Sequence, residues 1–173
     1  MFIFLVNFIT FVEIHSRQDS SKARGVDTKK RKQKRVEFVL KEIMQFSVPI
    51  FFNKCKTKKS NWFLNLNNYT QASKNTSYRN SLLQKYGEIV KPLISHLEPI
   101  EGAVKITYTI YRHDGRKFDI GNVGAIVDKF VCDVLVSCNI LADDNYDIVK
   151  SVEYIWGGID KDNPRADVVI SKI

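Results

Sequence analysis

Five aspartates and a lysine gather in a short part of the chain. The stretch KFDIGNVGAIVDKFVCDVL, residues 117–135, contains Asp119, Asp128, Lys129 and Asp133, and Asp143 and Asp144 follow it. Carboxylate oxygens are the ligands that Mg²⁺ prefers, together with water. Carboxylates that lie close together repel one another unless a cation neutralises them. The composition of this segment therefore predicts either a charged, solvated helix face or a site for a hard cation.

Helical spacing of the apolar residues predicts a helix over residues 122–137. On a helical wheel the core face holds Val123, Ile126, Val127, Phe130, Val131 and Val134. Lys129 and Asp133 fall on the same stripe as Asn122, whereas Asp128 lies off that stripe on the polar side. Asp119 precedes the helix, where the helix dipole favours a carboxylate. The simpler alternative is a solvated edge with a weak Lys129–Asp133 ion pair, followed by a turn at residues 143–144.

The other elements follow from shorter patterns. An alternating run over residues 102–113 predicts a half-buried strand, and a spacing of three or four predicts a helix over residues 77–96. Further strands are expected at 46–53, where Pro49 favours an edge position or a strand start, and at 148–156 and 166–171. Residues 54–76 are expected to form a polar loop, and residues 157–165 a turn. The predicted order is β-α-β-α-β-β, an α+β domain with a mixed sheet and helices packed on it.

The polar loop over residues 54–76 mixes lysines with aromatic side chains. It contains Lys54, Lys56, Lys58 and Lys59, followed by Trp62 and Phe63. Lysines suit a nucleic-acid backbone, and aromatic rings suit unstacked bases. The two aromatic residues could equally anchor a surface loop to the core, and the sequence leaves both interpretations open.

Residues 1–43 differ from the rest of the chain. The first 14 residues are apolar but too short to cross a bilayer comfortably, and residues 15–35 carry nine Lys/Arg against two Asp. Such a basic stretch is typical of disorder or of a nucleic-acid-binding arm. We also expect that translation naturally starts at Met44, which an intact N-terminus at Met1, seen by mass spectrometry, would contradict. The expected organisation is an extension, residues 1–43, and one domain, residues 44–173.

The three cysteines show neither a CxxC pair nor a histidine at ligand spacing. A structural zinc site is therefore not expected, and a sparse, odd number of cysteines fits a reducing compartment. We expect a cytoplasmic protein without stable membrane association.

Several segments together resemble one protein family. RKFDIGN, DKFVCDVL, ADDN and GGIDKDNPRADVVI, in this order and spacing, resemble the RusA family of Holliday junction resolvases, especially its phage-type members. SNWFLNLNNY resembles the opening loop of that group. The resemblance spans about Met44 to the end of the chain. It implies a RusA-like homodimer that cleaves four-way DNA junctions with Mg²⁺, or with Mn²⁺ as the alternative, in DNA recombination or repair, and a bacterium or a phage-infected cell as its source.

The resemblance also assigns roles to single residues. Asp119 and Asn122 match the first and last positions of the family's DxDN motif, Lys129 matches its lysine, and Asp144 matches its last acid. Two departures concern the third ligand: the second aspartate of DxDN is Gly121 here, and Lys129 follows Asn122 about one helical turn later than in shorter members. Asp128 is the candidate replacement. The expected catalytic residues are Asp119, Lys129 and Asp144, and the expected metal ligands are Asp119, Asp144, Asp128, Asp133 and Asp143.

Expected DNA contacts come from basic and polar residues around this segment. They are Lys56, Lys58, Lys59, Asn61, Trp62, Arg79, Arg116 and Lys117. Two alternatives to the nuclease remain open on the sequence. One is a RusA-like module that binds branched DNA but does not cut it, and the other is a nucleic-acid-binding protein that acts through the basic arm.

Overall fold

A computed structural model describes residues 43–53 and 61–173. These residues belong to one compact unit of the chain, residues 39–173. The expected extension, residues 1–43, lies outside the described residues except for its last position. The described elements are β1 (Ile43–Pro49), β2 (Phe51–Asn53), β3 (Asn61–Phe63), α3 (Leu66–Ser73), α4 (Thr76–Ile94), β4 (Val104–Arg112), α5 (Ile120–Ser137), β5 (Val149–Ile159) and β6 (Arg165–Lys172).

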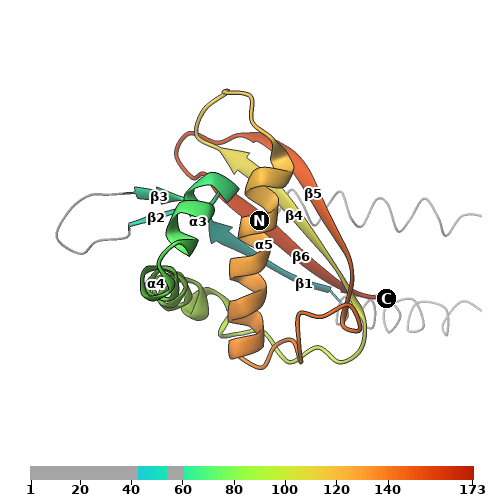
Figure 1. The fold of residues 1–173 in the computed structure, drawn as a ribbon. Helices are drawn as coiled ribbons and strands as arrows, with labels where there is room; N and C mark the ends of the chain where they lie inside the picture. The colour runs from blue at the N-terminus through green and yellow to red at the C-terminus, as the bar shows by residue number, and fades with distance from the viewer. Residues whose placement is uncertain (1–42, 54–60) are drawn as a thin grey trace, which may run out of the picture. The chain divides into compact units, whose positions relative to one another are not determined.

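The described strands form a mixed four-stranded sheet and a separate hairpin (Figure 1). The sheet has the order β1-β6-β4-β5, in which β4 and β5 run parallel and the other neighbours run antiparallel. The hairpin pairs β2 with β3. Three helices accompany these strands in the described part of the chain. The prediction of an α+β domain with a mixed sheet is confirmed at this level.

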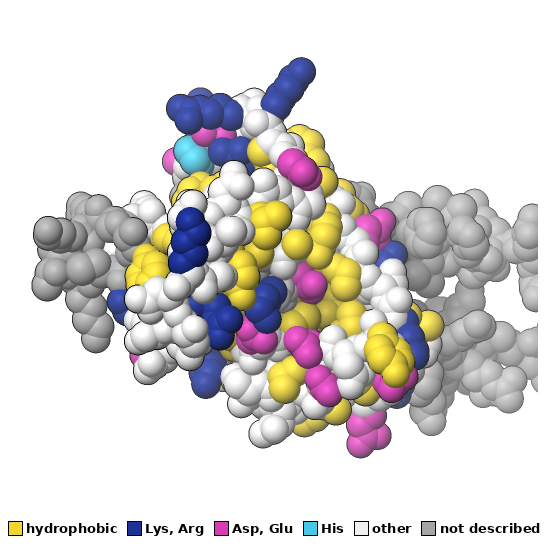
Figure 2. All heavy atoms as spheres, in the orientation of Figure 1, with side chains coloured by type: hydrophobic (Ala, Val, Ile, Leu, Met, Phe, Trp, Pro, Cys, Tyr) yellow, Lys and Arg dark blue, Asp and Glu magenta, His cyan; other side chains and the backbone are white. Residues whose placement is uncertain are grey.

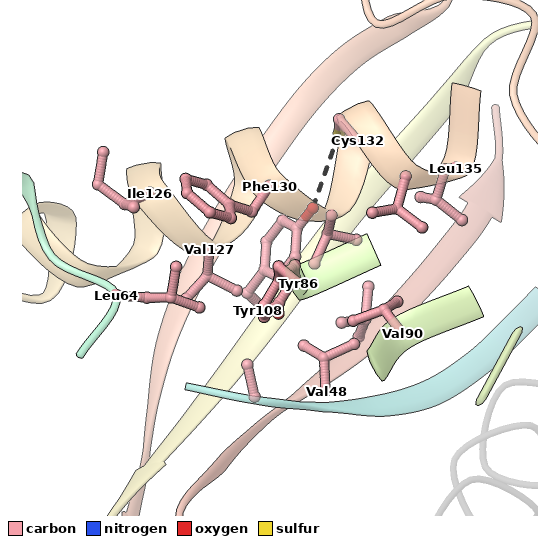
Figure 3. Packing of buried hydrophobic residues seen from close by; sticks show 14 of the residues in the cluster. Val48, Leu64, Tyr86, Val90, Tyr108, Ile126, Val127, Phe130, Cys132 and Leu135 are labelled. Carbon is pink, nitrogen blue, oxygen red and sulfur yellow. Dashed lines mark hydrogen bonds between the residues drawn. The ribbon is translucent and has the colours of Figure 1, made fainter. Parts of the chain in front are cut away.

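The core lies between the sheet and the helices. Every second residue of β4 is buried, from Val104 to Arg112, because alternate side chains of a strand point to the same face. All six residues of the predicted core face of α5 are buried as well. Figure 3 shows Val127, Phe130 and Leu135 of α5 directed toward Tyr108 and Tyr86, below the helix. Helix α5 is therefore positioned by one continuous apolar contact with the sheet and α4.

Two predicted boundaries were wrong in ways that glycine and proline explain. The strand expected at 46–53 is divided between β1 and β2; Pro49 ends β1, which is an edge strand as its proline favoured. Strand β5 continues through Gly157 and Gly158, which were expected to form a turn. A shift in register occurs there, and Gly158 has a φ of +115°, so the glycines form an irregularity within the strand.

The segment expected to be a polar loop, residues 54–76, contains β3 and helix α3. Helix α3 has a polar sequence, but Asn65 caps it by accepting a hydrogen bond from the Asn68 amide at 2.9 Å. Ala72 is buried, and Tyr69 packs partly against the core. The Asn65 cap and the core contacts of Ala72 and Tyr69 thus stabilise a helix that hydrophobic periodicity does not predict. Residues 54–60 of this segment lie outside the described residues.

Within residues 43–53 and 61–173, no helix is long and apolar enough to cross a membrane.

Two buried helical glycines give a test of the packing of α5. A Cβ added at Gly124 would lie 2.5 Å from the ring of Tyr154 on β5, whereas one at Gly87 on α4 would meet its neighbours at 3.8 Å. We expect Gly124→Ala to lower the free energy of unfolding by about 1–3 kcal/mol through overpacking. The control, Gly87→Ala, should raise it by up to about 1 kcal/mol, because alanine favours a helix. Urea denaturation measures both; equal effects would contradict the close approach of α5 to β5.

Candidate functional site

Asp128 is the most unusual carboxylate of the predicted group, because it is half-buried against the sheet. The hydroxyl of Tyr108 on β4 donates a hydrogen bond to Asp128 Oδ1 at 2.8 Å, and the thiol of Cys132 donates to the same oxygen at 3.4 Å. Tyr154 on β5, whose ring lies against Gly124, is near enough to Asp128 for each group to affect the pKa of the other. Figure 3 shows the hydroxyl end of Tyr108 reaching Cys132 on α5. Tyr108 on the inner strand β4 thus forms a hydrogen bond with Asp128 on α5.

The spacing of α5 explains this position. Gly124, Asp128 and Cys132 recur every four residues and therefore lie on one stripe of the helix. Gly124 leaves room for the Tyr154 ring, so this stripe approaches β4 and β5 closely. The helical wheel placed Asp128 on the polar side, which is wrong for the folded protein: its stripe faces the β5 side of the sheet.

Burial sets the electrostatics of the Asp128 network. Desolvation raises the pKa of Asp128, and the hydrogen bonds from Tyr108 and Cys132 oppose this effect. Desolvation and the nearby Asp128 carboxylate raise the pKa of Tyr154 to about 12. The pKa values of the Tyr108 hydroxyl and the Cys132 thiol are raised mainly by burial as well. At neutral pH these three groups are therefore protonated and able to donate hydrogen bonds to Asp128.

Asp144 lies close enough to Asp128 to act on it. Its negative charge contributes to the raised pKa of Asp128 and to that of Cys132. Asp144 is exposed, and its backbone amide donates to Asp143 Oδ1 at 2.7 Å. Asp143 Oδ2 accepts a second hydrogen bond from the Asn145 side chain, also at 2.7 Å. Asp143 therefore shapes the turn after α5, and Asp144 is the acid of this turn that acts on Asp128.

Asp119 caps helix α5. Its Oδ1 accepts hydrogen bonds from the amides of Gly121 and Asn122, at 2.9 and 3.3 Å. The rise of an ideal helix places the Cα atoms of Asp119 and Asp128 about 13 Å apart along the axis. Asp119 therefore lies at the opposite end of the predicted group from the Asp128–Asp144 pair.

Asn122 has a structural contact that its sequence position did not predict. Its Oδ1 accepts a hydrogen bond from the Leu66 amide at 2.7 Å. Leu66 begins α3, where the first amides of a helix lack partners within the helix. Asn122 therefore ties the start of α3 to the first turn of α5.

Lys129 and Asp133 form an ion pair, with Nζ 3.5 Å from Oδ2. Both side chains are substantially exposed, so the pair adds little to stability. The i, i+4 contact that the sequence favoured is confirmed. Figure 2 shows acidic side chains gathered over α5 and the segment that follows it.

No three acids of the predicted set come together as a metal site in the described part of the chain, and neither do other groups of His, Cys, Asp and Glu. Among the described contacts, Asp119 caps α5, Lys129 pairs with Asp133, and the charge of Asp144 contributes to the raised pKa of Asp128. Two carboxylates are enough protein ligands for Mg²⁺, which commonly binds one or two of them and completes its coordination shell with waters and substrate phosphates.

The predicted DNA contacts are distributed over several surfaces. Lys56, Lys58 and Lys59 lie outside the described residues. Asn61 is exposed on β3, and Arg79 on α4 contacts Asn80. Arg116 and Lys117 are exposed in the loop between β4 and α5, where Arg116 lies 3.6 Å from Asp114.

Among the predicted DNA contacts that the structure describes, Trp62 alone is buried. Its indole packs against Phe52 and Phe130, and the side chain is only 6% exposed. The second interpretation of the sequence, an aromatic anchor of the loop, describes its place in this structure. A buried ring offers no face on which a base could stack.

Sequence reasoning missed Tyr108, Tyr154 and Cys132 as members of the site. Tyr108 carried a usable signal, because a buried tyrosine normally needs a hydrogen-bond partner for its hydroxyl. The alternation of β4 already predicted that Tyr108 would be buried. Nothing in the sequence, however, indicated which helix position lies above it.

Neither a family model nor a curated protein matches this sequence. The RusA resemblance is thus carried by the motifs quoted above and by no further comparison.

The burial of Asp128 predicts a dependence of stability on pH. The pKa of Asp128 is raised above its ordinary value of 3.8, so the folded state binds the proton more tightly than the unfolded chain. Unfolding then becomes easier as the pH rises from about 4 through the raised pKa. We expect Asp128→Asn to be more stable than the wild type at pH 7 in EDTA, and this advantage to shrink as the pH falls toward 4.

Urea denaturation at a series of pH values measures this effect. Asp147→Asn removes a charge from an exposed residue of the neighbouring segment and serves as the control. A wild type that equals or exceeds Asp128→Asn in stability at pH 7 would overturn the account of Asp128 as a destabilising acid.

Proposed function

We propose that this protein is a Mg²⁺-dependent endodeoxyribonuclease that cleaves branched DNA, in the manner of a RusA-like Holliday junction resolvase. The observation that carries the proposal is Asp128, a half-buried carboxylate held by Tyr108 and Cys132, whose pKa is raised by desolvation and, to a smaller degree, by the charge of Asp144. Two such carboxylates oppose folding unless a cation offsets their charge. The pair occurs in the two segments, DKFVCDVL and ADDN, that resemble that family.

The donor atoms of this pair suit the proposed ion. Asp128 and Asp144 would hold Mg²⁺ through carboxylate oxygens, and Mn²⁺ suits the same donors. When bound, the ion supplies an activated water and stabilises the charge that develops on the phosphate. The proposed mechanism is hydrolysis of a phosphodiester that leaves a 5′-phosphate, as the resemblance implies.

The residues around the pair hold Asp128 in place. Tyr108 and Cys132 both donate to Oδ1, so they fix the rotamer of the carboxylate. Because Tyr108 is fully buried in the central part of the sheet, it is a rigid support. Preorganised ligands of this kind avoid reorganisation when charge develops.

Lys129 is proposed to act on the substrate rather than on the ion. Its ammonium is exposed, and within residues 43–53 and 61–173 its ion-pair partner is Asp133, one turn further along α5. An exposed, weak ion pair exchanges readily for a phosphate oxygen. Lys129 could then balance charge on the scissile phosphate, with Asp133 returning it to the same place after release.

We further propose that the enzyme acts as a homodimer, as the resemblance implies. A two-fold dimer presents two equivalent sites, and a four-way junction presents two equivalent strands. Each subunit would cut one of them.

One observation favours a second candidate, a module that binds branched DNA without cutting it. Gly121 stands where the resemblance expects an acid, and its amide donates to Asp119. Asp119 is therefore occupied as a helix cap, and the nuclease would depend on the Asp128–Asp144 pair alone. Measurement of cleavage separates the two candidates.

The test uses a synthetic four-way junction with Mg²⁺ or with EDTA. We expect paired, symmetric nicks with Mg²⁺ and none with EDTA. Asp144→Asn and Asp128→Asn should each lower the cleavage rate at least about 100-fold, because each removes a ligand of the ion. Lys129→Ala should lower the rate about 10- to 100-fold while leaving Mg²⁺ dependence in place.

Asp147→Asn is the matched control, because it removes the same charge from an exposed acid three residues after Asp144. Cleavage by Asp147→Asn should equal that of the wild type. Tight, structure-selective binding without nicks would replace the nuclease by the binding module, and equal loss in Asp147→Asn and Asp144→Asn would exclude a specific role for the pair.

A further inference from the structure

Trp156 on β5 is the most unusual aromatic residue of the surface. It is 46% exposed, whereas the protein's other tryptophan, Trp62, is 6% exposed and lies in the core. Trp156 pairs with Ile110 across the sheet, so it points to the face on which Ile110 is buried and α5 lies. Because β5 is the edge strand, α5 does not cover this part of the face.

A continuous stack of planar groups supports Trp156 from the interior. The Phe118 ring lies edge-on to the indole, with centroids 5.5 Å apart. The guanidinium of the buried Arg112 lies 4.8 Å from the Phe118 ring and 5.4 Å from the ring of Phe63. Phe63 in turn stacks on Phe51 at 4.5 Å. The stack thus runs from the β2–β3 hairpin to the surface and ends at Trp156.

Arg112 is fixed within this stack. Its NH2 group lies 2.9 Å from Asp114 Oδ1, and NH1 donates to the Arg116 carbonyl at 3.4 Å. A buried cation held by a carboxylate and two aromatic rings has little freedom to move. Phe118 and Trp156 are therefore preorganised, and the indole has lost part of its rotamer freedom before any partner binds.

The surroundings of Trp156 select an anionic partner. Arg116, which is 86% exposed, and Lys117 directly precede Phe118. The acids of the same loop are already engaged: Asp114 contacts Arg112 and Arg116, and Asp119 caps α5. Lys117 forms no ion pair with any described residue. Figure 2 shows the Lys and Arg side chains at the top of the view, with exposed hydrophobic side chains just below them.

Trp156 also lies beside the proposed metal site. It is two residues along β5 from Tyr154, on the same face, a separation of about 7 Å. The ring of Tyr154 lies against Gly124, one turn before Asp128 on α5. A nucleotide whose phosphate reaches the Asp128–Asp144 pair would therefore bring a neighbouring base close to the indole.

We propose that Trp156 is a stacking platform for an unpaired DNA base next to the scissile phosphate, with Lys117 and Arg116 contacting the adjoining backbone. Base stacking on an aromatic ring is insensitive to sequence and needs a base that has left the duplex. Such bases occur at the branch point of a junction. The proposal rests on the proposed function for its substrate, but it concerns binding, which can be measured without cleavage.

The test measures binding in EDTA, with a four-way junction that carries 2-aminopurine at the branch point. Wild-type protein should change the 2-aminopurine fluorescence and quench the fluorescence of the exposed tryptophan. Trp156→Leu should abolish the 2-aminopurine response and weaken binding by about 5- to 100-fold. Trp156→Phe keeps a flat ring and should retain most of the response.

Ile155→Ala is the matched control. Ile155 is adjacent on β5, is 40% exposed and points to the opposite face, where it pairs with Thr109. It should bind like the wild type. Circular dichroism shows whether Trp156→Leu is folded, and Trp156→Phe keeps the test decisive if it is not.

The outcomes separate this inference from the proposed function. Normal cleavage with unchanged binding and 2-aminopurine response in Trp156→Leu would overturn the platform and leave the nuclease standing. If the wild type does not cut the junction, and the 2-aminopurine response of the wild type is absent in Trp156→Leu, the platform is supported and the nuclease is removed. A Trp156→Leu protein that becomes monomeric in sedimentation, while binding DNA as before, would overturn the platform in favour of a protein interface.

Discussion

The close approach of α5 to β5 determines the rest of this site. It depends on Gly124, where even one methyl group would collide with the ring of Tyr154. At this distance the next position of the same stripe, Asp128, is half-buried and meets the hydroxyl of Tyr108 on β4. One missing side chain thus determines where a carboxylate is buried, which tyrosines hold it and which acid of the following segment can reach it. The apolar contacts of Phe130 and Val127 with the sheet keep the helix at that distance.

The energetic cost of this arrangement is informative. The Asp128 carboxylate loses hydration where α5 packs against the sheet. Hydrogen bonds to it offset only part of this desolvation cost, as the raised pKa of Asp128 indicates. Asp144 adds to the cost instead of reducing it. No arginine or lysine contacts Asp128 among the ion pairs of the described residues, although Lys129 is its immediate neighbour in sequence and pairs with Asp133 instead. An acid that remains destabilised inside an otherwise well-packed core is typical of a functional site, since packing alone would favour an apolar residue there.

The sequence predicted those parts of the fold in which a periodic pattern determines burial. The alternation of residues 104–112 and the spacing of residues 123–134 predicted a strand and a helix whose buried faces agree with the structure. Patterns of this kind did not reveal α3, because its stability comes from Asn65, Asn122 and a few contacts rather than from an apolar face. Nor did they place Asp128. A helical wheel divides residues by angle alone, whereas burial also depends on how far the neighbouring strand extends beneath the helix. The pairing of Asp128 with Asp144 depends on the path of the chain after α5, which no local pattern encodes.

Gly121 lies in the first turn of α5, next to the capping residue Asp119. At the N-terminus of α5, Asp119 is neutralised by two amides and by the helix dipole, so this end of the helix has no unbalanced charge that calls for a cation. A side chain at Gly121 would begin 3.3 Å from Asp119 Oδ1, and an acid there would restore a repulsive pair. In this chain the repulsive pair instead lies two turns further along, where neither amides nor the dipole can compensate it. Under the proposed function, an ion would therefore bind near Asp128 rather than at the start of the helix, and a glycine at position 121 is compatible with that proposal.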